Sequence, residues 1–255
     1  MGLLTGKNIV ITGVLTDASL AFGVAKLAQR EGAEIVLTGA GRALSLTERT
    51  ARKLETPVPV FEMDVTVPEH LENVRNELAS RWGRVDGVLH SIGFAPASCL
   101  GDDFMAAPWE DVSMAMNIST YSFKALADAF VPLMTSGGSL VGLDFDNSVA
   151  WPAYNWMGVA KSALESLNRY LAKELGPKGV RTNLVAAGPI KTMAAKSIPG
   201  FAKFEDVWSD RAPLGWDVYD SSAVAKAVVA LLSDWFPATT GEIIHVDGGF
   251  HAVAV

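Results

Sequence analysis

Short apolar runs alternate with longer segments of helical periodicity along the chain, and this pattern predicts its secondary structure. The apolar runs predict seven strands, at residues 7–13, 34–39, 58–65, 86–93, 138–145, 181–190 and 242–249. Apolar positions three and four residues apart predict helices between them, at residues 21–32, 44–54, 68–83, 109–130, 154–175 and 223–235. Strands that are apolar at both ends and alternate with helices are typical of a parallel sheet covered on both faces. The predicted fold class is therefore α/β, with one doubly wound parallel sheet.

The pattern continues from one end of the sequence to the other. No internal repeat, low-complexity tract or linker interrupts residues 1–255, so we expect one domain. Sheets of this kind bind ligands beyond the carboxyl ends of their strands. The residues with candidate chemistry follow predicted strands or open the next helix, which places the expected site at this edge.

Composition narrows the class of protein. Apolar residues make up 49% of the chain, enough for a buried core and too many for a disordered protein. The formal net charge of −7 argues against nucleic-acid binding. No run approaches the roughly 18 uninterrupted apolar residues of a membrane span, and the first residues lack a secretion-signal pattern. Cys99 is the only cysteine, which excludes an internal disulfide and favours the cytoplasm, and the four histidines lack metal-site spacing.

The segment TGVLTDASLAFG after the first strand is a candidate nucleotide-binding turn. Gly13 allows close backbone approach, and Ser19 precedes a helix whose free N–H groups favour a pyrophosphate; an ordinary turn with a Ser cap is the alternative. The second strand ends in TGAGR without an acid for the adenosine ribose, so Arg42 could meet a 2′-phosphate, stack on adenine or point to solvent. NADH and NADPH both remain open at this point. Asp64 suits an adenine pocket or a helix cap equally.

Tyr154 and Lys161 lie seven residues apart in a predicted helix. Seven residues make almost two turns, so both side chains leave the helix on nearly the same face. A phenol and an ammonium on one face can polarise a carbonyl beside a nucleotide. Phe145 at the end of the fifth strand provides an apolar wall, or is a core residue.

These residues lie in strings that resemble the short-chain dehydrogenase/reductase superfamily. The chain is most similar to its enoyl-acyl-carrier-protein reductase branch of type II fatty acid synthesis, actinobacterial members included. The resemblance spans essentially the whole chain and is carried, in order, by the strings TGVLTDASLAF, VDGVLHSIGF, GLDFD, PAYNWMGVAKSALES, NLVAAGPIKT and ATTGEIIHVDGG. It implies a Rossmann-type fold and an oxidoreductase that reduces the trans-2 double bond of enoyl thioesters on acyl carrier protein with NADH.

The resemblance also implies residue roles. Tyr154 would hydrogen-bond the thioester carbonyl, Lys161 would bind the nicotinamide ribose, and Phe145 would border the reacting atoms. The other cofactor-binding residues would be Gly13, Ser19, Leu20, Asp64, Val65, Ser91, Ile92, Gly93, Ile190 and Thr192. With Phe145 and Tyr154, the substrate-binding residues would be Met157 and Ala194.

Two departures from the mycobacterial pattern change the expectation. Ala40 and Gly41 replace the aromatic residue that stacks on adenine and the acid after it, so NADPH remains an alternative to NADH. The segment from Pro189 to Arg211, with the substrate-binding loop at about 191–211, is shorter, so we expect acyl chains of medium length. The resemblance further implies a homotetramer, and Lys191, Lys196, Lys203 and Arg211 could meet the acidic carrier protein or be solvated surface charges.

Two rival functions differ from enoyl reduction in what the site must contain. One is a short-chain dehydrogenase that acts on a ketone or alcohol; such enzymes carry a Ser where this chain has Gly142 or Val141, and their Tyr lies one turn from the Lys. The extra turn moves the phenol roughly 4–5 Å along the helix axis. That suits an enolate whose oxygen is remote from the carbon that receives hydride. The other rival is a non-catalytic dinucleotide-binding sensor, which would not need both Tyr154 and Lys161.

Overall fold

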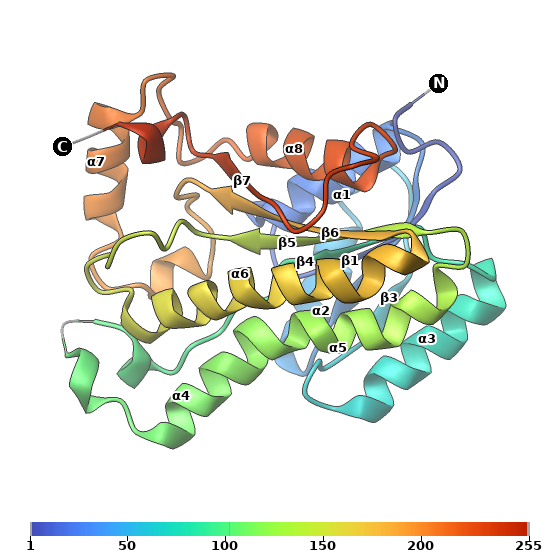
Figure 1. Cartoon of the computed structure of the whole chain (residues 1–255), viewed down its shortest axis with the longest axis horizontal. Coiled ribbons are helices and arrows are strands. Elements are labelled where there is room, and N and C mark those ends of the chain that lie inside the picture. The colour runs from blue at the N-terminus through green and yellow to red at the C-terminus, as the bar shows by residue number, and fades with distance from the viewer. Residues whose placement is uncertain (1, 102, 254–255) are drawn as a thin grey trace.

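A computed structural model, which describes residues 2–101 and 103–253, shows the predicted parallel sheet (Figure 1). The strands run in the order β3-β2-β1-β4-β5-β6-β7, and every neighbouring pair is parallel. The α/β prediction is confirmed. The strands are β1 (Asn8–Thr12), β2 (Glu34–Gly39), β3 (Val60–Glu62), β4 (Gly87–His90), β5 (Gly138–Asp144), β6 (Val180–Ala187) and β7 (Ile243–Val246).

Helices cover both faces of the sheet (Figure 1). They are α1 (Leu20–Arg30), α2 (Arg42–Ala51), α3 (Pro68–Trp82), α4 (Trp109–Met116), α5 (Ser122–Phe130), α6 (Asn155–Leu175), α7 (Ala202–Arg211) and α8 (Ser222–Leu232). Residues of α1 and α8 pack in one apolar core, and residues of α3, α5 and α6 pack in a second core with other strand side chains. None of the helices in the described part is both long and apolar enough to cross a membrane.

The predicted helix over residues 109–130 is two helices joined by a π-helical segment, Asn117–Tyr121. Within the segment, the Thr120 hydroxyl donates to the carbonyl oxygen of Ala160 in α6 (2.7 Å). This hydrogen bond fixes the π-helical segment against α6. Ile118 of the same segment lines the candidate site. Asn117, the first residue of this segment, is exposed and is not among the residues that line that site.

The structure places a helix, α7, within the segment expected to form the substrate-binding loop. Phe204 and Trp208 lie four residues apart and are both buried, so they form one apolar face of α7. This face packs in an aromatic cluster with Phe145, Trp151 and Phe250. The apolar spacing FAKFEDVW was the available signal for this helix.

His90 is a fully buried imidazole at the end of β4. Its Nε2 hydrogen-bonds the Ser122 hydroxyl at 2.7 Å, while Nδ1 has no partner among the described residues. Burial, reinforced by the charge of Lys161, lowers the pKa of His90 from about 6.5 to about 3. The His90 ring is therefore neutral in the folded protein at neutral pH.

We expect His90 to make the fold sensitive to acid. Because its folded pKa is lowered, the unfolded chain binds the proton more readily below pH 6.5. The free energy of unfolding should then fall by about 1.4 kcal/mol for each pH unit between 6.5 and 3. Urea unfolding of the wild type and His90→Gln at pH 6.5 and 5.5 measures this contribution. Equal pH slopes in both proteins would show that His90 is not its source.

Candidate active site

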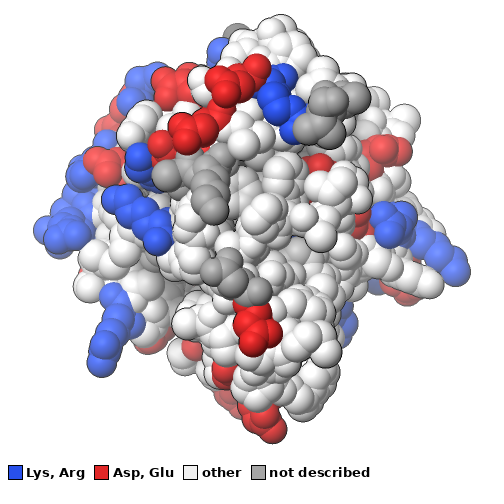
Figure 2. All heavy atoms as spheres, turned by 90° about the vertical axis from the view of Figure 1, so that its left-hand side faces the viewer, with Lys and Arg blue, Asp and Glu red and all other residues white. Residues whose placement is uncertain are grey.

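A cavity of ≈ 740 Å³ lies at the carboxyl ends of the strands. Every catalytic, cofactor-binding and substrate-binding residue predicted from the sequence lines it, from Gly13 at one end of the set to Ala194 at the other. Figure 2 views this end of the molecule, where uncharged side chains occupy the centre and charged ones gather towards the margin. The structure thus brings residues from across the chain to one mostly uncharged cavity.

The turn after β1 is shaped for close approach of a ligand. Gly13 has φ of 81°, and a Cβ there would lie 1.9 Å from the carbonyl oxygen of Ser91. Ser19 immediately precedes α1, but its hydroxyl does not cap the helix. Instead its Oγ accepts from the backbone N–H groups of Leu15 and Thr16 (3.1 and 3.0 Å). Ser19 is therefore the cap residue of α1 by position but not by a side-chain hydrogen bond, and its hydroxyl hydrogen is left to a ligand.

The adenosine end of the cavity is held by α2. Thr47 and Thr50 donate to the carbonyl oxygens of Val14 and Leu15 (2.7 and 2.8 Å), which fixes the turn after β1. Arg42 is exposed and is not among the cavity residues, whereas Ala40 is. The geometry offers no basic side chain from this segment for a 2′-phosphate.

Asp64 lines the same end of the cavity. Its Oδ1 accepts from the backbone N–H and the hydroxyl of Thr66 (2.9 and 2.7 Å), so it stabilises a turn. The following helix, α3, is preceded by Val67 rather than by Asp64, and the helix-cap alternative is wrong. The second carboxylate oxygen remains for a ligand amine.

Tyr154 lies one residue before α6, so the prediction that it is part of the helix is wrong. The residues on either side of it, Ala153 and Asn155, both have positive φ, 62° and 41°. Gly101 holds this strained turn: its N–H donates to Ala153 O (2.9 Å) and its carbonyl accepts from Asn155 Nδ2 (2.6 Å). Backbone strain of this kind is common at functional sites. The direction of the phenol is therefore set by the turn as well as by α6.

Lys161 lies within α6 and is buried. Its Nζ donates to the carbonyl oxygen of Leu143 in β5 at 2.7 Å. Burial lowers the pKa of Lys161, and the nearby Asp144 carboxylate opposes that change. Burial, with the charge of Asp144, raises the pKa of the Tyr154 phenol well above its usual value. The phenol is consequently a hydrogen-bond donor across the physiological pH range.

Phe145 lines the cavity and also packs in the aromatic cluster, so both readings of it apply. Its ring centroid is 5.2 Å from that of Tyr154, 5.9 Å from Phe204 and 5.7 Å from Trp208. The cluster fixes the plane of an apolar wall beside the phenol. Ser139, by contrast, is a buried strand residue whose hydroxyl donates to Leu231 O (2.8 Å). Gly142 and Val141 also lie within β5, so the dehydrogenase serine has no counterpart at those positions.

Several cavity residues had not been predicted. Asp144 is the most notable, because a carboxylate at the end of β5 borders the cavity between Lys161 and Phe145. Its position at the carboxyl end of a strand was an available signal. The others of chemical interest are apolar: Phe94, Leu100, Ile118, Met193, Ile198, Phe201 and Phe204.

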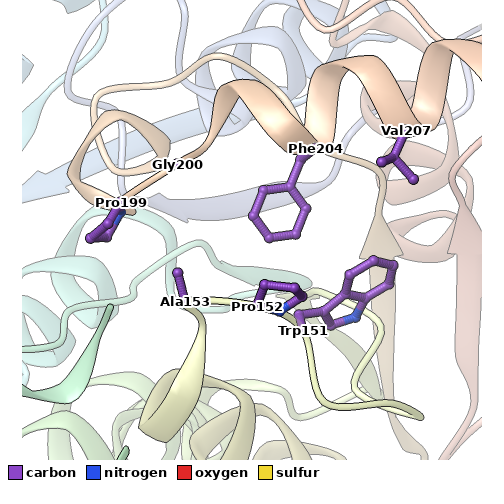
Figure 3. Close-up of a pocket in the computed structure, with 7 residues that line it drawn as sticks. All are labelled: Trp151, Pro152, Ala153, Pro199, Gly200, Phe204 and Val207. Carbon is purple, nitrogen blue, oxygen red and sulfur yellow. The ribbon is translucent and has the colours of Figure 1, made fainter. Parts of the chain in front are cut away.

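A second cavity of ≈ 340 Å³ lies between α7 and the turn before Tyr154 (Figure 3). Phe204 and Val207 point into it from α7, opposite Trp151, Pro152 and Ala153. Among the described side chains, Phe204 alone lines both cavities. Its ring is therefore a partition between them.

The basic residues near α7 differ in availability. Lys191 pairs with Glu205 at 2.8 Å, and the Arg211 guanidinium lies over the Phe250 ring, 4.6 Å from its centroid. Lys196 is exposed. The side chain of Lys203 lies outside the described part of the chain.

Known proteins resemble the chain over nearly its full length. A family model described as Enoyl-(Acyl carrier protein) reductase matches residues 13–251. A protein of Mycolicibacterium smegmatis named enoyl-acyl-carrier-protein reductase (NADH) is 52% identical, covering 97% of this chain and 97% of its own length. A protein of the same name from Mycobacterium avium is 49% identical with the same coverage. Another from Aquifex aeolicus is 39% identical, covering 100% of this chain and 95% of its own length.

Proposed function

The chain belongs to the enoyl-acyl-carrier-protein reductase family, and from this premise we propose that it reduces the trans-2 double bond of enoyl-acyl carrier protein in fatty acid biosynthesis. NADH is the cofactor, as it is in the names of the relatives. The observation that carries the proposal is the grouping of Tyr154, Lys161 and Phe145 around one cavity, with no serine at the dehydrogenase positions.

Tyr154 is the residue that stabilises the enolate. NADH supplies the hydride, which goes to C3, and the electron pair of the double bond moves to the thioester oxygen. A phenol whose pKa is raised by burial keeps its proton and donates a hydrogen bond to that oxygen. Phe145, fixed by the aromatic cluster, keeps water from the reacting carbons.

The chain's other cavity residues bind and orient the cofactor. Lys161 already donates to Leu143 O and has two further hydrogens for ribose hydroxyls. The space above Gly13, which a Cβ would fill, and the start of α1 suit a pyrophosphate. The remaining cofactor-binding residues are Ser19, Leu20, Asp64, Val65, Ser91, Ile92, Gly93, Ile190 and Thr192.

The absorbance of NADH, followed with crotonyl and dodecenoyl thioesters beside 3-ketoacyl thioesters, tests this function. We expect oxidation that depends on the enoyl substrates alone. Oxidation with the 3-ketoacyl substrates instead would indicate a ketoreductase. Binding of NADH without turnover of either class would indicate a nucleotide sensor.

Phe204 limits the length of the acyl chain that the main cavity accepts. Met157 and Ala194 line the substrate side of this cavity, and the ring of Phe204 separates it from the second one. The volume beyond the partition is apolar in its lining and suits only chains long enough to reach it. This supports the preference for medium-length chains.

We expect Phe204→Ala to join the two cavities and favour longer substrates. Each methylene that becomes buried contributes about 0.8 kcal/mol, so if about two more methylenes of the longer chain are buried, the ratio of kcat/KM for hexadecenoyl over octenoyl thioesters should rise about tenfold. Val207→Ala is the matched control, because Val207 lines the second cavity alone and leaves the partition in place. An unchanged ratio in Phe204→Ala, with the variant folded, would contradict the partition.

The acyl carrier protein is the partner that presents the substrate, and exposed Lys196 is one basic contact for it. A homotetramer is supported by exposed apolar side chains on α4 and α6, such as Trp109, Met114 and Val159. The single-domain organisation and the cytoplasmic location belong to the same proposal.

A further inference from the structure

Asp144 is a buried carboxyl group that the protein leaves without a partner. Its side chain ends β5, is 5% exposed and lines the main cavity. Neither Oδ1 nor Oδ2 makes a hydrogen bond of normal geometry within the described chain, although the Phe145 N–H and the Glu165 carboxyl group lie close by. A buried ionised carboxylate without partners is costly, so such a group is either neutral or completed by a ligand.

Its position points towards the nicotinamide end of the cofactor site. The preceding residue, Leu143, supplies the carbonyl oxygen that anchors Lys161, and the following residue, Phe145, contacts Tyr154. Asp144 therefore lies between the residue proposed to bind the nicotinamide ribose and the wall beside the reacting atoms. A charge that develops on the nicotinamide would act directly on this carboxyl group.

The surroundings of Asp144 bring its protonated and ionised forms close in free energy at neutral pH. Burial raises the pKa of Asp144 to about 7; the charge of Lys161 opposes this rise and that of Glu165 adds to it. The titratable or charged groups on the elements around it are Lys161 and Glu165 of α6, Tyr154 before α6, neutral His90 of β4, His245 in the same row of β7, and Asp146 after β5. Lys161 is the only lysine or arginine among them.

We propose that Asp144 is a redox-linked proton site, which holds a proton while the reduced, uncharged nicotinamide is bound and releases it when the nicotinamide is oxidised and cationic. This inference rests on the proposed cofactor site. A unit positive charge beside a carboxyl group, at an effective dielectric constant of about 20, lowers the proton affinity of that group on the order of hundredfold. The proton would thus become available as hydride transfer creates the enolate.

The proposal balances the overall reaction. The hydride leaves C4 of the nicotinamide with its electron pair and forms the C3–H bond, and the double-bond pair moves to the thioester oxygen. The Asp144 carboxyl group gives up one proton and C2 takes one up as the enolate returns to the thioester, while the Tyr154 hydroxyl keeps its own proton and hydrogen-bonds the oxygen. Asp144, left as a carboxylate, is reprotonated from solvent past the half-buried Glu165. One proton is consumed for each NADH oxidised.

Proton release on nucleotide binding tests this directly, without turnover. At pH 7 in weak buffer with an indicator dye, NAD⁺ binding to the wild type should release about half a proton per chain more than NADH binding. Asp144→Asn, which is neutral in all states, should show no difference between the two nucleotides. Asp146→Asn is the matched control, because it makes the same change two residues away, outside the cavity lining; its release should equal that of the wild type.

The outcomes separate this inference from the proposed function. An equal release for NAD⁺ and NADH in the wild type, or a release that persists in Asp144→Asn, would overturn the assignment to Asp144. Loss of the release in Tyr154→Phe together with its persistence in Asp144→Asn would assign the proton to the phenol. Difference infrared spectra of the wild type give a second readout: the protonated-carboxyl band should be present with NADH and lost with NAD⁺. Failure to reduce any enoyl thioester would instead contradict the proposed function.

Discussion

Replacing Tyr154 with phenylalanine should lower kcat for enoyl reduction by about 10²–10³-fold while the Kd for NADH stays within about twofold. The substitution keeps the ring that packs at 5.2 Å from Phe145 and removes only the hydroxyl. A donor directed at the developing enolate stabilises the transition state more than the bound substrate, so the loss appears in kcat. Steady-state rates with dodecenoyl thioester and fluorescence titration of NADH measure the two quantities.

Tyr170→Phe is the matched control for this substitution. Tyr170 lies on α6, is 69% exposed and is remote from the cavity residues, so removal of its hydroxyl should leave both quantities unchanged. A Tyr154→Phe enzyme with wild-type kcat would remove the phenol from the mechanism. A large loss of NADH affinity would place it in the cofactor site instead.

The layers of the fold could be predicted from the sequence because the spacing of apolar residues along the chain reflects which side chains face the core. Strands such as 34–39 and 138–145 are mostly apolar on both faces, since helices cover both of their faces, and the structure places β2 and β5 within those ranges. Helix ends were harder to place. The segment 109–130 keeps helical periodicity across Asn117–Tyr121, and nothing in that pattern distinguishes an α-turn from a π-turn stabilised by a contact with α6.

The site was predictable at the level of which residues gather, because strand ends in a parallel sheet meet at one edge. The local geometry of Tyr154 was not. Its position depends on Ala153 and Asn155 in left-handed conformations, and these are stabilised by Gly101, more than fifty residues earlier. Asp144 was overlooked for a related reason: a carboxylate at a strand end is ordinary in sequence, and its lack of partners exists only in three dimensions.

Lys161→Ala should raise the Kd for NADH by about 10²–10³-fold, the largest effect expected on binding. Two charge-assisted hydrogen bonds to ribose hydroxyls, each contributing about 1.5–3 kcal/mol, account for a loss of this size. Calorimetric titration of NADH measures it. Lys173→Ala, on the exposed last turn of α6, is the control and should bind NADH as the wild type does.

The same substitution should also change the charge of the site in a way that Tyr154→Phe does not. Lys161 is the cation that holds the pKa of Asp144 down against burial. Without it that pKa should rise further, so the pH at which proton release on NAD⁺ binding is greatest should move upward, even at saturating nucleotide. Because Tyr154→Phe leaves this cation in place, its release should match the wild type. Equal losses of NADH affinity in both variants would show that the two residues do not divide the work between nucleotide binding and enolate stabilisation.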